Sequence, residues 1–129
     1  MKTCCFTIFL TLFFLNARSQ DLACSDLHEG SFTLDGKEFG IITIERTANS
    51  QTETCDLLNF QATYDIVWTG ECEYELRNKK VLKGESKYGN EATDVIKATV
   101  IKISGNSILL RLSSNFADFE TECEITKIK

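Results

Sequence analysis

The chain has a single histidine, His28, and this limits the chemistry that its side chains could support. With one histidine we expect neither a catalytic triad nor a histidine-rich metal site, and Cys–His catalysis would require a free thiol in an oxidising compartment. We interpret His28 as a loop residue near the rim of the fold. The sequence therefore predicts no catalytic residue, no metal site and no cofactor, and we expect no enzymatic activity.

Acidic side chains are abundant, but their spacing favours a solvated surface. Glutamates alternate with other residues in two segments, at Glu73 and Glu75 and again at Glu120, Glu122 and Glu124. Such alternation is typical of the wet face of a β-strand, and we prefer this interpretation to a calcium site or a site for a basic partner. The sequence contains no EF-hand, Walker or dinucleotide-binding glycine motif.

An aromatic row is the most suggestive feature for binding, and it consists of Phe60, Tyr64, Trp68 and Tyr74. In a roomy barrel these rings would line a cavity for a small apolar ligand. In a small eight-stranded barrel the same rings would simply fill the interior. We expect the last three rings to point inward, because a one-residue slip would bury the charged residues between them.

The elements that would position these residues are β-strands, since the hydrophobic period is two rather than 3.6. The clearest stretch is 60–68, where every second residue is apolar. Turn residues separate eight such segments, near 31–34, 38–47, 51–57, 60–68, 72–80, 95–104, 107–114 and 118–128. Short links predict antiparallel neighbours, and closure would remove exposed sheet edges. We therefore expect an all-β, up-and-down meander closed into a small lipocalin-like barrel.

The first 19 residues have the organisation of a secretory signal peptide. Lys2 precedes an apolar run at 5–15, and Ala17 and Ser19 occupy the −3 and −1 positions of a cleavage site. The run is shorter than the roughly 20 residues that a membrane span needs. We predict a signal peptide at 1–19 and one domain at 20–129, in a secreted or periplasmic protein. A lipoprotein with lipid on Cys24 is the alternative.

The mature chain of 110 residues is acidic. Cleavage removes Lys2 and Arg18, so the 14 Lys and Arg become 12 against 19 Asp and Glu, and the charge becomes −7. Nucleic acids and anionic lipids bind basic surfaces, so we expect neither as a partner. Because cleavage removes the apolar run at 5–15, we also expect no membrane span in the mature chain. Four cysteines remain, Cys24, Cys55, Cys72 and Cys123, without a C-x-x-C motif. They allow three disulfide connectivities.

Two sets of residues carry a resemblance to known proteins. Leu27, Gly30 and Phe32 resemble the glycine–aromatic opening of lipocalin-like barrels. The stretches CSDLHEGSF at 24–32, ITIERT at 42–47 and W-x-x-x-C-x-Y-x-L at 68–76 resemble a family of short secreted proteins from flavobacteria-type bacteria. That family has no established function, so the resemblance implies export and a β-meander. Its members resemble this chain at Cys24 and Cys72, whereas Cys55 and Cys123 look like additions.

The order of the strands provides a separate test of the pairing. Cys24 precedes the first strand and Cys72 begins the fifth, so an even number of reversals places both at the same rim of an up-and-down barrel. A Cys24–Cys72 bridge closing about 48 residues would stabilise the fold by roughly 4 kcal/mol. Cys55 and Cys123 form the second candidate pair, although they lie in mid-strand and would need a flattened barrel to approach each other.

These expectations favour an exported, non-enzymatic binding module for a small apolar ligand or a protein partner. The candidate ligand-binding residues are Phe60, Tyr64, Trp68 and Tyr74. The alternative is a structural or interaction protein of the cell envelope with a solid core and no ligand. An internal cavity would distinguish the two.

Overall fold

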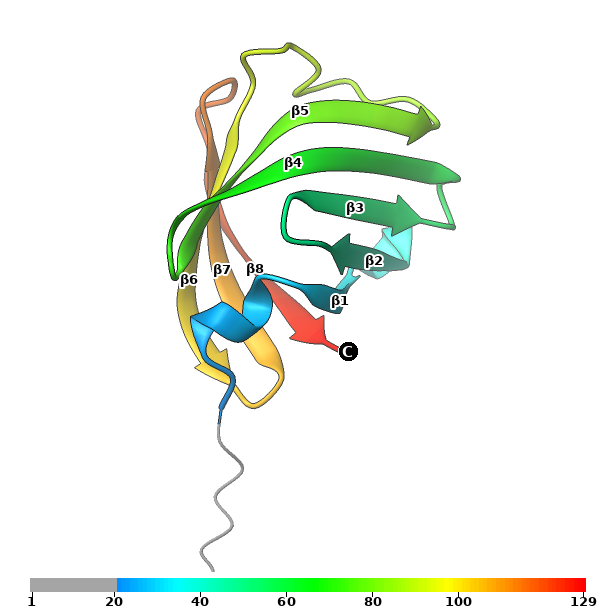
Figure 1. Ribbon diagram of the computed structural model, residues 1–129. Coiled ribbons are helices and arrows are strands. Elements are labelled where there is room, and N and C mark those ends of the chain that lie inside the picture. The colour runs from blue at the N-terminus through cyan, green and yellow to red at the C-terminus, as the bar shows by residue number, and fades with distance from the viewer. Residues whose placement is uncertain (1–20) are drawn as a thin grey trace, which may run out of the picture.

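The computed structural model describes residues 21–129, which form an eight-stranded, closed, antiparallel barrel in the order β1 to β8 (Figure 1). The strands are β1 (Gly30–Asp35), β2 (Ile41–Arg46), β3 (Ser50–Cys55), β4 (Phe60–Gly70), β5 (Glu73–Lys83), β6 (Ile96–Ser104), β7 (Ser107–Ser114) and β8 (Glu120–Lys127). The predicted all-β, up-and-down barrel is confirmed. The predicted signal peptide lies outside the described residues. No helix among the described residues is long and apolar enough to cross a membrane.

The alternation in the sequence sets which side chains form the core. On β4, Ala62, Tyr64 and Ile66 are buried, while the residues between them face outward. The same period on the other strands adds the fully buried side chains of Phe32, Ile108 and Ile125. This packing of alternate residues from every strand is what a small closed barrel requires.

One strand is shorter than the sequence predicted. The prediction placed residues 38–47 in a single strand, but β2 begins only at Ile41 and a 3₁₀-helix, η2 (Lys37–Phe39), precedes it. Lys37 and Gly40 both have positive φ, and the Gly36 N–H donates to the Gly40 carbonyl, so the chain turns instead of extending. The Phe39 side chain consequently remains 50% exposed.

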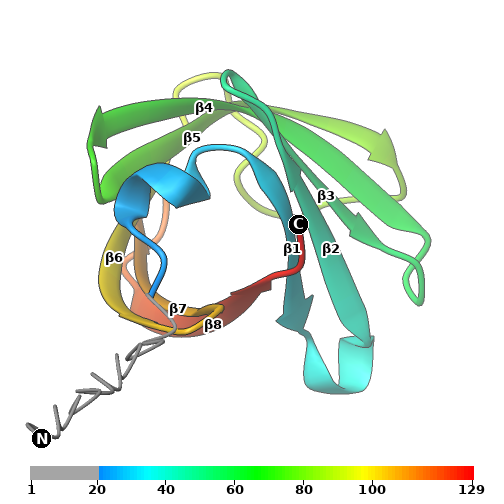
Figure 2. The same cartoon turned by 60° about the horizontal axis from the view of Figure 1, so that its bottom comes forward.

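The two ends of the barrel differ, and we call them the closed end and the open end. The closed end is crossed by the 3₁₀-helix η1 (Cys24–Leu27), which faces the viewer in Figure 2 and whose Leu27 is fully buried. The open end carries the long connection 84–95 between β5 and β6 and the turn 115–119 between β7 and β8. Only four residue pairs join β5 to β6, up to Leu76 with Ile96, so β5 continues past its neighbour toward the open end.

Candidate functional site

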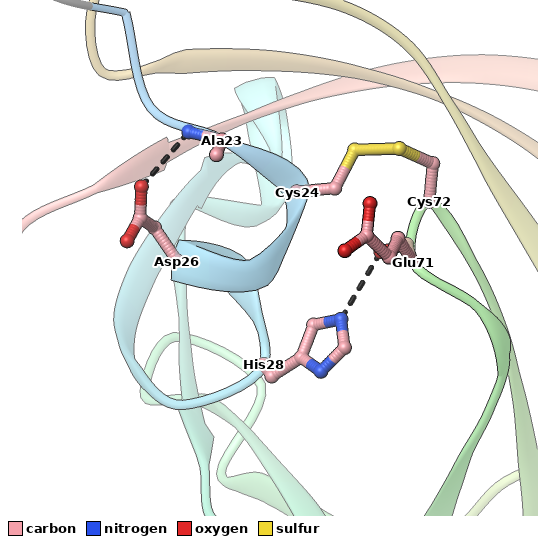
Figure 3. Close-up of a disulfide and its surroundings, with 6 residues drawn as sticks. All are labelled: Ala23, Cys24, Asp26, His28, Glu71 and Cys72. Carbon is pink, nitrogen blue, oxygen red and sulfur yellow. Dashed lines mark hydrogen bonds between the residues drawn. A yellow bond between two sulfur atoms is a disulfide. The ribbon is translucent and has the colours of Figure 1, made fainter.

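The closed end is held by a disulfide between Cys24 and Cys72, 48 residues apart in the sequence (Figure 3). The predicted pair is therefore confirmed, together with the rim argument that gave it. Because the Cys24 sulfur forms this bond, it cannot carry a thioether-linked lipid, and the lipoprotein alternative is wrong. Figure 3 also shows His28 beside the bridge, where its Nε2 lies 3.0 Å from the Glu71 carbonyl oxygen and donates to it. His28 is thus the rim residue that the sequence predicted.

Trp68 also belongs to the closed end. Its ring stacks on the His28 ring with the two ring centroids 3.6 Å apart, and its centroid lies 4.7 Å from that of the Tyr74 ring. The indole N–H is buried, and no hydrogen-bond acceptor lies within reach of it in residues 21–129. Trp68 and Tyr74 therefore pack beside the η1 segment, and Trp68 also lines a surface hollow with His28 and Lys127.

A buried arginine, which was not predicted from the sequence, joins several elements at this end. Arg46 is only 5% exposed and lies 4.7 Å from the Phe32 ring centroid and 4.5 Å from that of Tyr74. Its guanidinium donates to three acceptors, which are the Leu27 carbonyl at 2.9 Å, Gln51 Oε1 at 2.7 Å and the Tyr74 hydroxyl at 2.6 Å. These bonds join η1, β3 and β5 to the end of β2.

The hydrogen bonds continue from Arg46 toward the open end. Gln51 donates through Nε2 to Glu53 Oε1 at 2.9 Å, and Glu53 points into the barrel with part of its surface accessible to water. Burial raises the pKa of Glu53, while the hydrogen bond from Gln51 and the charges of Lys79 and Arg46 act in the opposite direction. The interior near Glu53 is therefore polar and incompletely filled.

Replacing Glu53 by glutamine should change how stability depends on pH. The native state holds the Glu53 proton to a higher pH than the unfolded chain does, because its pKa is raised above 4.5. Its contribution to stability is fully present below pH 4.5 and declines as the pH rises through the native pKa. In urea unfolding, the free energy of unfolding of Glu53→Gln minus that of wild type should therefore be larger at pH 7.5 than at pH 4. The same difference at both pH values would contradict this assignment. Glu120→Gln is the surface control.

A pocket of about 470 Å³ opens at the other end of the barrel. Tyr64 and Leu76 form its inner wall, and the connection 84–95 and the turn 115–119 form its outer wall. Gly89 lies against the Phe116 ring, so the two loops meet beside the pocket. The residues that line it are Tyr64, Leu76, Lys79, Ser86, Tyr88, Gly89, Asp94, Ile96, Phe116, Ala117 and Phe119. This volume lies within the roughly 300–1,000 Å³ that small-molecule sites occupy.

The predicted aromatic row is divided between three places. Tyr64 lines the pocket, Phe60 lies in a neighbouring surface hollow with Phe39 and Tyr88, and Trp68 and Tyr74 belong to the closed end. Tyr64 and Tyr74 are buried, and Phe60 and Trp68 pack against the core. The inward direction of these rings is confirmed, but the four residues do not line one cavity.

The two buried tyrosines predict a contrast in stability. The Tyr74 hydroxyl accepts a hydrogen bond from Arg46, whereas the Tyr64 hydroxyl has no hydrogen-bond partner within residues 21–129. Bonds to charged groups contribute about 1.5–3 kcal/mol. Tyr74→Phe should therefore lose roughly that amount of unfolding free energy, and Tyr64→Phe should stay within about 0.5 kcal/mol of wild type. Urea titration of both variants measures the difference, and equal losses would contradict the hydrogen-bond assignment.

The second candidate disulfide is not formed. Cys55 and Cys123 are free thiols, on β3 and β8, and β1 and β2 separate those strands in the barrel. The Cys55 thiol instead donates to the Phe39 carbonyl at 3.2 Å. Burial raises the pKa of the Cys123 thiol. The barrel is thus not flattened enough to join these two residues.

The acidic stripes lie on the outer surface. Arg111 forms ion pairs with Glu120 at 3.0 Å and Glu122 at 3.7 Å, and Glu75 pairs with Arg77. In residues 21–129 no three His, Cys, Asp or Glu side chains come close enough to hold a metal ion. Three glutamates of the stripes therefore pair with arginines on the surface, and Glu124 accepts a hydrogen bond from Ser107.

The open-end pocket is the arrangement that best fits a functional site, because it joins an apolar wall to a few polar groups. Lys79 and Asp94 are its charged residues, and neither was recognised in the sequence. Comparison of the chain with family models, with characterised proteins and with solved structures finds no match, so the assignment of the site rests on its own residues.

Proposed function

We propose that this protein is an exported, non-enzymatic binding protein that holds a small apolar ligand in the pocket at the open end of its barrel. The observation that carries the proposal is the pocket itself, about 470 Å³ in volume and lined by Tyr64, Leu76, Ile96, Phe116 and Phe119. A mostly apolar concavity with a few convergent polar groups is the usual form of a ligand site.

The difference between the two ends supports this proposal. The closed end is fixed by the disulfide, by Arg46 and by the stacked Trp68, so it can hold the barrel in shape. The open end carries the connection 84–95 and the turn 115–119, and loops commonly hold binding residues on a rigid scaffold. One end therefore provides stability while the other is available for a ligand.

A fluorescent apolar probe, N-phenyl-1-naphthylamine, tests the proposal. We expect saturable binding, and Ile96→Trp should weaken it at least tenfold because an indole would fill the pocket. Val67→Trp is the matched control, since Val67 is exposed on the outer face of β4, and it should bind within twofold of wild type. Equal binding by both variants would place the probe elsewhere.

The compartment is also part of the proposal. The disulfide supports an oxidising environment, which secreted and periplasmic proteins share. A leader at 1–19 and the resemblance to short secreted proteins of flavobacteria-type bacteria agree with export. Sequencing the N-terminus of protein recovered outside the cytoplasm tests this, because it should begin near Gln20.

The alternative function is a structural or interaction protein of the envelope. It is favoured by the tightly packed closed half, where Leu27, Phe32 and Ile108 are fully buried. Under this alternative the probe would not bind saturably, and the open-end loops would contact another protein.

A further inference from the structure

The Tyr64 hydroxyl lies at the pocket and has no hydrogen-bond partner in residues 21–129. Tyr64 is only 7% exposed, and its hydroxyl has no hydrogen-bond partner within residues 21–129. In the described part of the chain, Trp68 Nε1 is the one side-chain nitrogen or oxygen that is both inaccessible to water and without a hydrogen-bond partner. The Tyr64 hydroxyl does not belong to that class, although it too has no partner. The hydroxyl therefore keeps accessible surface, and Tyr64 lines the pocket. Burial and the nearby Glu53 raise the pKa of Tyr64, so it remains a neutral donor.

Lys79 provides a cation in the same pocket. A bulge at Asn78, which has a φ of 52°, shifts the alternation of β5 and brings Lys79 to the pocket. Its ammonium donates to Ser86 Oγ and to the Tyr88 carbonyl, which leaves one of its three hydrogens unused. Within residues 21–129 no carboxylate oxygen lies within 4 Å of it.

The neighbouring acids do not supply this missing partner. Asp94 Oδ2 accepts the Glu91 backbone N–H at 2.9 Å, and Glu53 accepts from Gln51. Both acids attract Lys79 only at longer range, and burial still lowers the pKa of its ammonium. A cation beside apolar walls is stabilised when an oxyanion contacts it directly.

We propose that the pocket binds an amphipathic monoanion, whose oxyanion head accepts hydrogen bonds from Lys79 and Tyr64 and whose apolar body contacts Leu76, Ile96 and Phe116. The simplest head of this class is a carboxylate. The inference rests on the proposed function, because it assigns the ligand class of the same pocket. It also explains why an unpartnered phenol and an unpaired ammonium share one apolar site.

The test compares two ligands with the same chain and different heads, decanoate and decan-1-ol, as competitors of N-phenyl-1-naphthylamine. The measured quantity is the ratio of the alcohol's half-displacing concentration to that of the acid. Lys79→Met should lower this ratio at least tenfold, since a charge-assisted bond contributes about 1.5–3 kcal/mol and each 1.4 kcal/mol is tenfold. Tyr64→Phe should lower it about fivefold.

Two controls separate head recognition from general damage. Lys79→Arg keeps the charge and should retain the ratio within threefold of wild type. Lys80→Met removes a neighbouring exposed charge and should leave the ratio within twofold. Thermal unfolding of each variant verifies that the barrel is folded.

The outcomes distinguish this inference from the proposed function. If the probe binds but Lys79→Met and Tyr64→Phe leave the ratio unchanged, the head assignment is wrong and the apolar pocket stands. If the probe does not bind, decanoate is titrated directly by calorimetry. Binding that is lost in Lys79→Met then supports the inference, and no binding overturns both.

Discussion

Replacing Arg46 by methionine should destabilise the barrel by about 3–5 kcal/mol, because three buried acceptors would lose their donor and each unpaired group costs about 1–3 kcal/mol. Methionine keeps most of the apolar length but makes no hydrogen bond. The Leu27 carbonyl, Gln51 Oε1 and the Tyr74 hydroxyl would each lose their bond to the guanidinium. Urea unfolding followed by far-UV circular dichroism measures the loss.

Arg111 provides the matched control for this prediction. It lies on the outer surface, with a side chain 47% exposed, and pairs with Glu120 and Glu122. Exposed ion pairs contribute about 0–1 kcal/mol, so Arg111→Met should change stability by no more than that. Similar losses in the two variants would show that Arg46 does not hold the closed end together.

Removing the Cys24–Cys72 disulfide should cost about 4 kcal/mol. The bond closes a loop of 48 residues, and the chain-entropy model gives that value for the extra freedom of the unfolded chain. The total stability of a domain of this size is about 5–15 kcal/mol, so the Cys24→Ala/Cys72→Ala variant should unfold at a much lower urea concentration.

The two free cysteines supply the control for the disulfide. The Cys55→Ala/Cys123→Ala variant keeps the bridge and should lose much less, about 1 kcal/mol for each thiol. Adding a reductant should destabilise this variant and wild type alike, but leave the bridge-less variant unchanged. Insensitivity of wild type to the reductant would contradict the structural role of the bond.

Much of the scaffold follows from the alternation of residues. The period-two pattern at 60–68 is confirmed by β4, and strand parity alone brings Cys24 and Cys72 to one rim. These features depend on local sequence and on a simple meander, in which each strand pairs with the next. Local patterns are therefore sufficient to predict them.

The arginine network and the open-end pocket were harder to predict, because they depend on contacts between distant segments and on a bulge. Arg46 follows Ile42 and Ile44 in the alternation, so parity places it inside, but a buried guanidinium is stable only with acceptors from three distant segments. Lys79 would face outward in a regular strand, and the bulge at Asn78 reverses it. The pocket also needs two loops that carry no periodic signal.

The most direct test of the open-end site is a titration of ¹⁵N-labelled protein with N-phenyl-1-naphthylamine, followed by two-dimensional NMR of the backbone amides and the Trp68 indole. We predict that the largest shift changes fall on Tyr64, Leu76, Ile96 and residues 115–119, with small changes at Trp68 and at residues 24–29, because the pocket lies at the other end of the barrel. Changes centred on Trp68 and His28, or no saturable change at all, would contradict a ligand site at the open end.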